Sequence, residues 1–381
     1  MFYYLGIWGF AVLNAALGVM ALRFLCRRLE KRGPVGRLGV VPLLLALCVA
    51  GIGAFAVGSL FVSVGVLHIF SLVMFWYANV VVVPAVLGVA AYWIAWKGNP
   101  LRLTANARVL GILLFLPPPL CAYATFIEPY QLQLERAEMK ISGMESAQTP
   151  IRIAVLADIQ TDSIGTHEER AVDMALATDP DMIVLPGDFF QGSDEEFEAV
   201  LPSYRALLSR LHAPGGVFAC PGNIDRLDRL IRLFEGTSVC FLNNEVVTVK
   251  LAGITIAIGG VENRFYHAAG KEMVQVLSNT ESDVRILLAH LPDAASPRTS
   301  ADHIDLIISG HTHGGQVVIP GLGPLITATS VPRTVGAGGL HRVGEQWIYV
   351  SRGVGFERAG APPMRFNCPP EVSLITLQAG E

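Results

Sequence analysis

The chain has 381 residues, enough for two domains that each bury a core. Its charges are unevenly spread: nine of the 28 Lys and Arg residues, but only one of the 32 acidic residues, precede Glu128, so 19 basic and 31 acidic residues remain in the C-terminal part. This acidic part argues against a nucleic-acid partner, because phosphate backbones are held mainly by Lys and Arg. It suits divalent cations bound by carboxylates instead.

Residues 1–127 are predicted to form an all-α transmembrane domain of four helices. Four apolar runs, each about as long as the 20 residues that span a bilayer, provide this pattern. They lie near 3–25, 39–61, 67–96 and 109–127. Their centres lack the ionisable residues that a transporter usually carries, which favours an anchor.

The basic residues of this part fall in two loops, 23–37 and 97–108, which the positive-inside rule places in the cytoplasm. Four spans then put the C-terminal domain on the outer face. The expected localisation is a multi-pass protein of the cell (inner) membrane, with that domain in the periplasm or outside the cell. One miscounted helix would reverse this orientation.

Residues 128–381 are predicted to form an α/β domain. Short apolar runs, each followed by a polar loop, predict strands, and amphipathic stretches between the first of them predict helices. The predicted strands are 151–157, 182–185, 217–220, 284–289 and 304–309, and the predicted helices are 168–177 and 195–211. In such folds ligands bind at the C-terminal ends of the strands.

The residues that follow these strands can all offer oxygen or nitrogen to a divalent metal. They are two carboxylates, two carboxamides and three imidazoles: Asp158, Gln160, Asp188, Asn223, His290, His311 and His313. Taken singly, a His after a strand is more often structural, and an Asn or Asp after Gly is a turn or helix-cap residue. Their recurrence favours a dinuclear centre that clamps a phosphoryl group. The glycines at 187, 222, 310, 314 and 315 suit the sharp turns of such a site.

These motifs resemble those of the calcineurin-like metallophosphoesterases, whose pattern is D-x-H, G-D, G-N-H-[DE], a lone H and G-H-x-H. The form G-H-T-H-G-G-Q at 310–316 is similar to the membrane-anchored bacterial branch of that family. The matching residues are Asp158-Ile159-Gln160, Gly187-Asp188, Gly222-Asn223-Ile224-Asp225, His290 and Gly310-His311-Thr312-His313.

The resemblance implies a two-sheet β-sandwich flanked by helices, with two divalent metal ions at one edge. It implies that Asp188 bridges both ions. The remaining ligands divide into one set of Asp158, Gln160 and His313 and another of Asn223, His290 and His311, with Asp225 in a supporting role.

Gln160 stands where the family pattern has a histidine. A carboxamide oxygen binds first-row metals more weakly than imidazole does, so we expect this ion to be held less tightly. The manganese-dependent ADP-ribose/CDP-alcohol diphosphatases of the same superfamily are similar here, with the same A-D-I-Q motif as residues 157–160. Manganese is therefore the favoured ion, with iron, zinc, magnesium or cobalt as alternatives.

Ile224 stands where many members carry the histidine that protonates the leaving group. Because an aliphatic side chain donates no proton, we expect a substrate with a leaving group that needs none, such as a pyrophosphate or an activated diester. His167 is a candidate replacement acid, and a solvated loop histidine is the alternative reading.

The sequence therefore predicts a membrane-anchored, metal-dependent phosphoesterase that cleaves a phosphodiester or pyrophosphate bond. Its expected partners are the lipid bilayer and a small-molecule or lipid-linked phosphoester, and no oligomeric state is predicted. A catalytically degenerate protein that binds metal or lipid is the alternative, because two histidines of the family pattern are replaced.

Overall fold

The computed structural model describes residues 117–381, apart from 142, 263–267, 293–302, 325, 344–345, 358–363 and 381. The chain divides into two compact units, which are Met1–Ala124 with Arg358–Pro363, and Thr125–Glu357 with Met364–Glu381. All seven candidate ligands lie in the second unit, which is described by itself below. The domain boundary expected at 127/128 stays a prediction.

The expected multi-pass inner-membrane localisation, with its domain on the outer face, is corrected by the structure. Within the described part of the chain, no helix has both the length and the apolar character needed to cross a membrane. Of the expected span 109–127, residues 117–127 are described, and they contain helix α6 (Pro117–Phe126). The other three expected spans lie outside the described residues.

The first of two six-stranded sheets has the order β1-β14-β2-β3-β4-β5. Strand β14 runs parallel to β1 and antiparallel to β2, and the strands from β2 to β5 are parallel. The strand bounds are β1 Gln133–Ile141, β2 Ile151–Val155, β3 Met182–Pro186, β4 Val217–Cys220, β5 Val239–Phe241 and β14 Glu371–Ala379.

The second six-stranded sheet has the order β12-β13-β9-β8-β7-β6. Its central strands β13, β9, β8 and β7 are parallel, and β12 and β6 are antiparallel additions at the two edges. The strand bounds are β6 Glu245–Leu251, β7 Ile254–Gly260, β8 Val284–Leu288, β9 Leu306–Ser309, β12 Gly339–Val343 and β13 Gln346–Val350.

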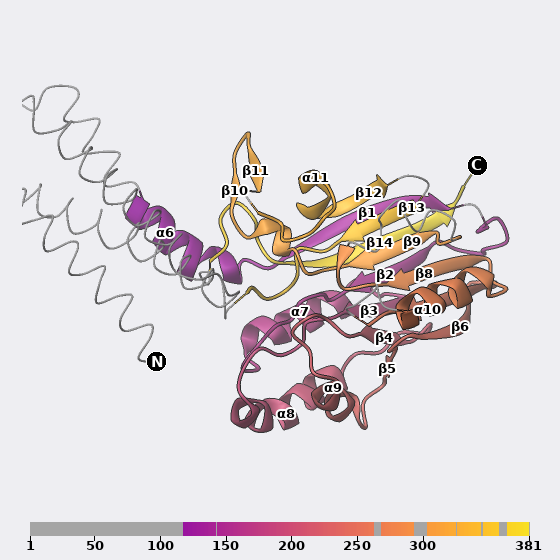
Figure 1. Cartoon of the computed structure of the whole chain (residues 1–381), viewed down its shortest axis with the longest axis horizontal. Coiled ribbons are helices and arrows are strands. Elements are labelled where there is room, and N and C mark those ends of the chain that lie inside the picture. The colour runs from indigo at the N-terminus through magenta and orange to yellow at the C-terminus, as the bar shows by residue number, and fades with distance from the viewer. Residues whose placement is uncertain are drawn as a thin grey trace, which may run out of the picture. The chain divides into compact units, whose positions relative to one another are not determined.

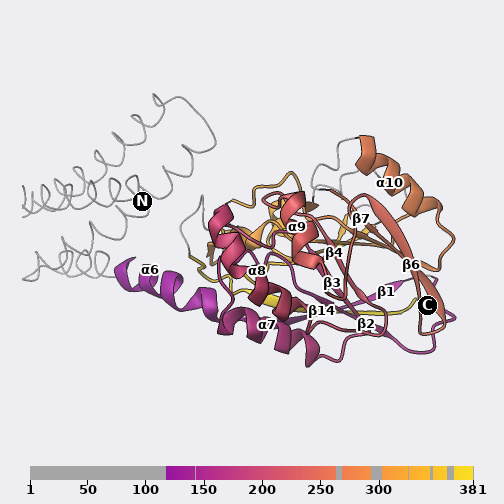
Figure 2. The ribbon, with the colours of Figure 1, turned by 90° about the horizontal axis from the view of Figure 1, so that it is seen from below.

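The two sheets pack face to face, and helices cover their outer faces (Figure 1). One apolar core contains buried side chains of both sheets, such as Ile153 of β2 and Ile286 of β8. The outer face of the first sheet packs against α7 (Thr166–Leu176), α8 (Asp194–Leu208) and α9 (Leu227–Phe234). The second packs against α10 (Ala268–Asn279) and α11 (Arg333–Gly336). Figure 2 shows α7, α8 and α9 grouped together and apart from α10.

This layering explains the sequence pattern of the strands. All residues of β3, β4 and β9 are buried, because each strand is covered on both faces, and such strands are continuous apolar runs. Helix α8 begins at a capping box, in which Ser193 Oγ accepts the Glu196 N–H at 3.2 Å and Glu196 accepts the Ser193 N–H at 2.7 Å. The α/β class and the two-sheet sandwich are thus confirmed.

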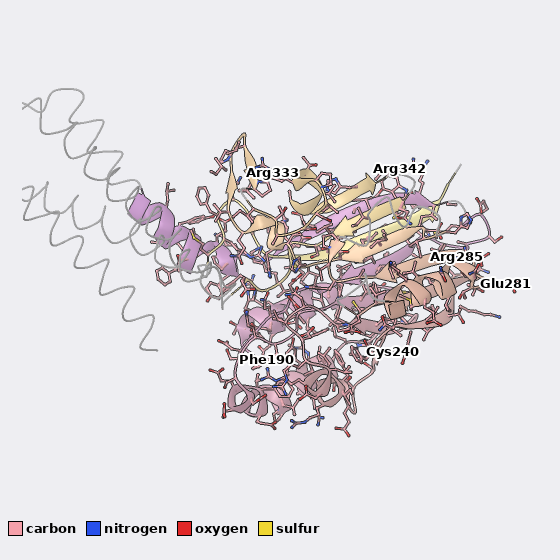
Figure 3. The ribbon with its side chains drawn as sticks, in the orientation of Figure 1. Phe190, Cys240, Glu281, Arg285, Arg333 and Arg342 are labelled. Atoms are coloured by element: carbon pink, nitrogen blue, oxygen red, sulfur yellow. The ribbon has the colours of Figure 1, made fainter. Side chains whose placement is uncertain are left out.

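The shorter elements are the 3₁₀ turns η1 (Glu128–Tyr130) and η4 (His313–Gly315) and the paired strands β10 (Val318–Ile319) and β11 (Gly323–Pro324). Three cysteines are free thiols: Cys220 and Cys368 are buried, and Cys240 lies exposed on β5 (Figure 3).

Candidate metal centre

The loops that follow β2, β3, β8 and β9 are joined by backbone hydrogen bonds at one end of the sandwich. The Asp158 N–H donates to the Gly187 carbonyl at 3.1 Å, and the Gln160 N–H donates to the Asp188 carbonyl at 2.9 Å. In the second sheet, the Gly310 N–H donates to the His290 carbonyl at 3.0 Å. The expectation that polar residues meet at the strand ends is therefore met within each sheet.

Backbone strain is concentrated at the candidate ligands. A positive φ is uncommon outside glycine and costs energy that the surrounding structure must supply. Five of the eleven non-glycine residues with positive φ in the described part of the chain are candidate ligands: Asp158 (48°), Gln160 (39°), Asp188 (56°), His311 (69°) and His313 (46°).

Two glycines of the motifs are required because a carboxylate approaches their Cα closely, not because of a turn. A Cβ on Gly222 would lie 2.0 Å from Oδ1 of Asp188, and a Cβ on Gly310 would lie 2.1 Å from Oδ2 of Asp158. Neither glycine has a positive φ, whereas Gly187 does, at +80°. The interpretation of all five motif glycines as turn residues is therefore wrong for Gly222 and Gly310, whose missing side chains make room for the two carboxylates.

The first group of ligands is formed by Asp188, His290, His311 and Asn223. One carboxylate oxygen of Asp188 and one nitrogen of each histidine lie within 4.8 Å of one another. Oδ1 of Asn223 lies 3.0 Å from Nε2 of His290 and 2.6 Å from Nδ1 of His311. The structure thus brings together one of the two sets that the resemblance implied, with Asp188 beside it.

Backbone carbonyls fix which nitrogen each of these histidines presents. Nδ1 of His290 lies 2.8 Å from the Pro186 carbonyl, and Nε2 of His311 lies 3.2 Å from the Ala328 carbonyl. Because a carbonyl only accepts, these two nitrogens carry hydrogens, and Nε2 of His290 and Nδ1 of His311 are the nitrogens directed toward Oδ1 of Asn223. A divalent ion bound there would take the lone pairs of these two nitrogens and displace any proton on Nε2 of His290.

Charge within the group also favours a cation. Burial lowers the pKa of His290, but the adjacent Asp188 carboxylate outweighs burial and raises it to about 10. Burial raises the pKa of Asp188, but the charge and hydrogen bond of His290, at 3.1 Å, bring it below its ordinary value. Positive charge beside Asp188 is therefore strongly stabilised.

The second group is formed by Asp158, Gln160 and His313. Nε2 of His313 lies 3.7 Å from Oδ1 of Asp158, and all three side chains are buried. Oε1 of Gln160 is buried and has no hydrogen-bond partner among the described residues. An orphaned buried acceptor is costly unless something binds it. A metal ion held with Asp158 and His313 would satisfy this oxygen.

Burial of the Asp158 carboxylate outweighs the positive charges near it. Burial raises its pKa to about 7, and the negative charge of Asp188 adds to this, although His290 and the N–H of His311 oppose it. Burial lowers the pKa of His313 well below its usual range, and the charge of Arg365 adds to this, so the imidazole is a neutral donor. A divalent cation would stabilise the Asp158 carboxylate and could bind the neutral imidazole of His313 directly.

The donor set therefore fits two divalent ions, one for each group, and it does not identify the element. The two positions differ in access to solvent. Asp158, Gln160 and His313 are buried, whereas His311 is half-buried and Asn223 is exposed. Asn223 and His311 are therefore the candidate ligands that solvent reaches most readily among the described residues.

Asp225 ties the first group together without being placed as a ligand. Its carboxylate accepts the N–H groups of Asp188 and Gly222 at 2.8 Å and that of Phe189 at 2.9 Å. It thereby links the loop after β3 to the loop after β4. This geometry gives a physical basis for the supporting role that the resemblance implied.

His167 is not brought into either group. It lies in the first turn of α7, where Nε2 is 2.9 Å from the Val354 carbonyl and the ring packs edge-on to Tyr130 at 5.7 Å. Neither this hydrogen bond nor this ring contact involves a candidate ligand. Its role as the replacement acid stays a prediction.

Three residues near the second group were missed from the sequence. Gln191 and Glu357 accept hydrogen bonds from Nε2 of Gln160 at 3.1 and 3.0 Å. Arg365, fully buried, donates to the carbonyls of several loops, including those of Arg352 and Gly355. Glu357 and Arg365 follow no strand-end motif. Gln191 follows G-D-F-F directly, which was the one available signal.

The comparisons with known proteins agree with this geometry. Residues 151–315 match the family described as calcineurin-like phosphoesterase. The chain is 30% identical over 267 residues to an uncharacterised metallophosphoesterase, YkuE, of Bacillus subtilis, covering 68% of this chain and 89% of that protein. It is also 30% identical over 275 residues to phosphodiesterase YaeI of Escherichia coli, covering 67% and 92%.

Among solved structures, TT1561 of Thermus thermophilus matches with a TM-score of 0.37 and 13% identity, over 54% of this chain and 91% of that one, which is too distant to carry an argument. The two relatives found by sequence are sufficient to assign the family. The chain therefore belongs to the calcineurin-like phosphoesterases, as the motifs indicated, and it is a metal-dependent phosphoester hydrolase.

Proposed function

We propose that this hydrolase cleaves a phosphodiester or pyrophosphate bond whose leaving group departs without protonation. The observation that carries the proposal is Ile224, at the position where many relatives have an acid. Its backbone N–H donates to Oδ1 of Asp188 at 3.1 Å, so this position lies directly beside the metal centre. An aliphatic side chain there has no proton to give.

The chain's own residues account for binding and orientation. Asp158, Gln160 and His313 would hold one divalent ion and Asn223, His290 and His311 the other, with Asp188 between them. Such ions polarise a phosphoryl group and make water a competent nucleophile near neutral pH. The exposed carboxamide of Asn223 and the half-buried ring of His311 line the accessible side.

The rate that a general acid contributes indicates which class of substrate this site could cleave without one. A positioned acid contributes about 10²–10⁴ in rate, so an alkoxide leaving group would lose that factor here. A phosphate leaving group, with a second pKa of about 6, would lose little. Pyrophosphates and activated diesters are therefore favoured, and a lipid-linked pyrophosphate is one member of this class.

The proposal is tested by the dependence of rate on the leaving group. We expect manganese-dependent hydrolysis of a series of substituted phenyl phosphodiesters to fall steeply as the pKa of the phenol rises. A matched variant, Ile224→His, supplies the missing acid and is expected to flatten that dependence, chiefly by accelerating the poor leaving groups. A flat dependence in the parent protein would show that another acid is present.

The same assay distinguishes an active hydrolase from the alternative, a catalytically degenerate protein that binds metal or lipid. Pyrophosphates, monoesters and a lipid-linked pyrophosphate are offered with Mn²⁺, Mg²⁺, Zn²⁺ and Co²⁺ in turn. Hydrolysis of pyrophosphates and activated diesters, but not of alkyl esters, is the expected result. No hydrolysis with any of the four ions would favour a protein that binds metal without turnover.

A further inference from the structure

The carboxamide of Gln160 is held in one orientation by two neighbours from distant parts of the chain. Its Nε2 lies 3.1 Å from Oε1 of Gln191 and 3.0 Å from Oε2 of Glu357. The two neighbours are also joined to each other, because Nε2 of Gln191 donates to Oε1 of Glu357 at 2.6 Å. The three side chains form a closed triangle of hydrogen bonds.

The carboxylate determines the direction of every bond in this triangle. Glu357 only accepts, so both glutamines must turn an NH₂ group toward it. Gln191 then presents its oxygen to Gln160, which again requires the NH₂ group of Gln160 on that side. The oxygen of Gln160 is therefore directed away from both neighbours, and it is the buried oxygen without a partner among the described residues.

Glu357 itself is anchored by the motif at 310–316. Its backbone N–H donates to Oε1 of Gln316, the last residue of that motif, at 2.8 Å. Gln191 is anchored by the loop after β2, because its N–H donates to the Thr161 carbonyl at 3.2 Å. The triangle thus links three segments around the second group of ligands.

We propose that Glu357 and Gln191 are positioning residues that hold Gln160 with its oxygen free to bind the ion shared with Asp158 and His313. These hydrogen bonds compensate for the replacement of the family's histidine by Gln160. A free carboxamide presents either end to an ion, and only its oxygen is a ligand. Fixing its orientation removes that ambiguity, so the weaker ligand remains usable.

The proposal rests on the proposed function for the presence of the ion, but its test is a binding measurement. The test is calorimetric titration of metal-free protein with Mn²⁺ alone, in which we expect two binding steps. Glu357→Gln is nearly isosteric but can donate to the Gln160 oxygen, so the amide loses its fixed orientation. We expect one step to weaken by about 10–100-fold, as for other residues that orient metal ligands, while the other step stays within twofold.

A matched control is Glu168→Gln. Glu168 is buried and, like Glu357, accepts two hydrogen bonds, here from Thr161 Oγ1 at 3.0 Å and the Gly165 N–H at 2.9 Å, neither of which involves Gln160. We expect it to lower the melting temperature without changing either binding step. Gln160→Met removes the ligand, so adding Glu357→Gln to it should weaken Mn²⁺ binding no further.

Each outcome is decisive. Two unchanged binding steps in Glu357→Gln, with or without a lower melting temperature, overturn the proposal, as does a parent protein that binds a single ion. If Glu357→Gln does not fold, Gln191→Met removes one of the two acceptors and is expected to weaken the same step by about tenfold; an unchanged step then overturns the proposal. A parent protein that binds two ions but hydrolyses no ester would refute the proposed function alone.

Discussion

Gly310→Ala places a methyl group against the Asp158 carboxylate and changes little else. The new Cβ would lie 2.1 Å from Oδ2 of Asp158 and 3.1 Å from Cβ of Ala157, whereas ordinary contacts begin at 3.4 Å. Gly310 has no positive φ, so alanine adds no backbone strain there. The carboxylate must therefore retreat by about 1 Å or more, and overpacking of this kind costs about 1–3 kcal/mol of the free energy of unfolding.

This displacement should separate metal binding from folding. Metal–ligand distances tolerate about 0.2 Å, so an oxygen moved by 1 Å no longer binds the ion. We expect calorimetric titration with Mn²⁺ to show one step weakened by about 100-fold, on the order of 2.7 kcal/mol. The matched control is Gly165→Ala, whose Cβ would meet its nearest neighbour at 3.6 Å. Two Mn²⁺ steps within twofold of the parent in a folded Gly310→Ala protein would show that this displacement does not disturb a metal ligand.

Three further predictions concern the whole centre. Chelation of divalent ions should lower the melting temperature, and Mn²⁺ at about 100 times its Kd should restore about 2.7 kcal/mol of stability; unchanged thermal unfolding would contradict this. Arg365→Met should lower the free energy of unfolding, measured in urea, by about 3 kcal/mol, because the buried carbonyls that Arg365 binds lose their donor. Arg342 is exposed (Figure 3), so the control Arg342→Met should change this free energy little. His167→Ala should slow diester hydrolysis less than tenfold, since its contacts are with Val354 and Tyr130; a loss of 10²–10⁴ would identify it as the acid.

Strands at the centre of the sheets were predictable because burial on both faces leaves a continuous apolar run. The runs beginning at 151, 182, 217 and 284 became β2, β3, β4 and β8 with ends shifted by no more than two residues. The pairing of β1 with β14 in the first sheet was not predictable in this way. β1 and β14 pair in register over nine residues although one begins at Gln133 and the other at Glu371. Pairing over such a separation is decided by packing rather than by local sequence.

The candidate ligands were predictable because each follows a strand, and parallel strands bring their ends to one edge. What the sequence could not show was how those ligands are oriented. The ring orientation of His290 depends on the carbonyl of Pro186, and the orientation of Gln160 depends on Glu357, nearly two hundred residues away. The sequence also could not show why residue 310 is a glycine. In the structure, its missing side chain makes room for the Asp158 carboxylate, which follows a strand of the other sheet.

The proposed activity is hydrolysis of an activated phosphodiester at a divalent-metal centre built around Asp188. The most direct measurement is the rate of hydrolysis of bis(4-nitrophenyl) phosphate by metal-free protein as Mn²⁺ is added, for the parent and for Asp188→Asn. We expect activity that appears with Mn²⁺, disappears with a chelator and falls by about 10³-fold or more in Asp188→Asn, because metal clamping supplies several kcal/mol of transition-state stabilisation. A parent rate that does not respond to Mn²⁺, or an Asp188→Asn rate equal to that of the parent, would contradict it.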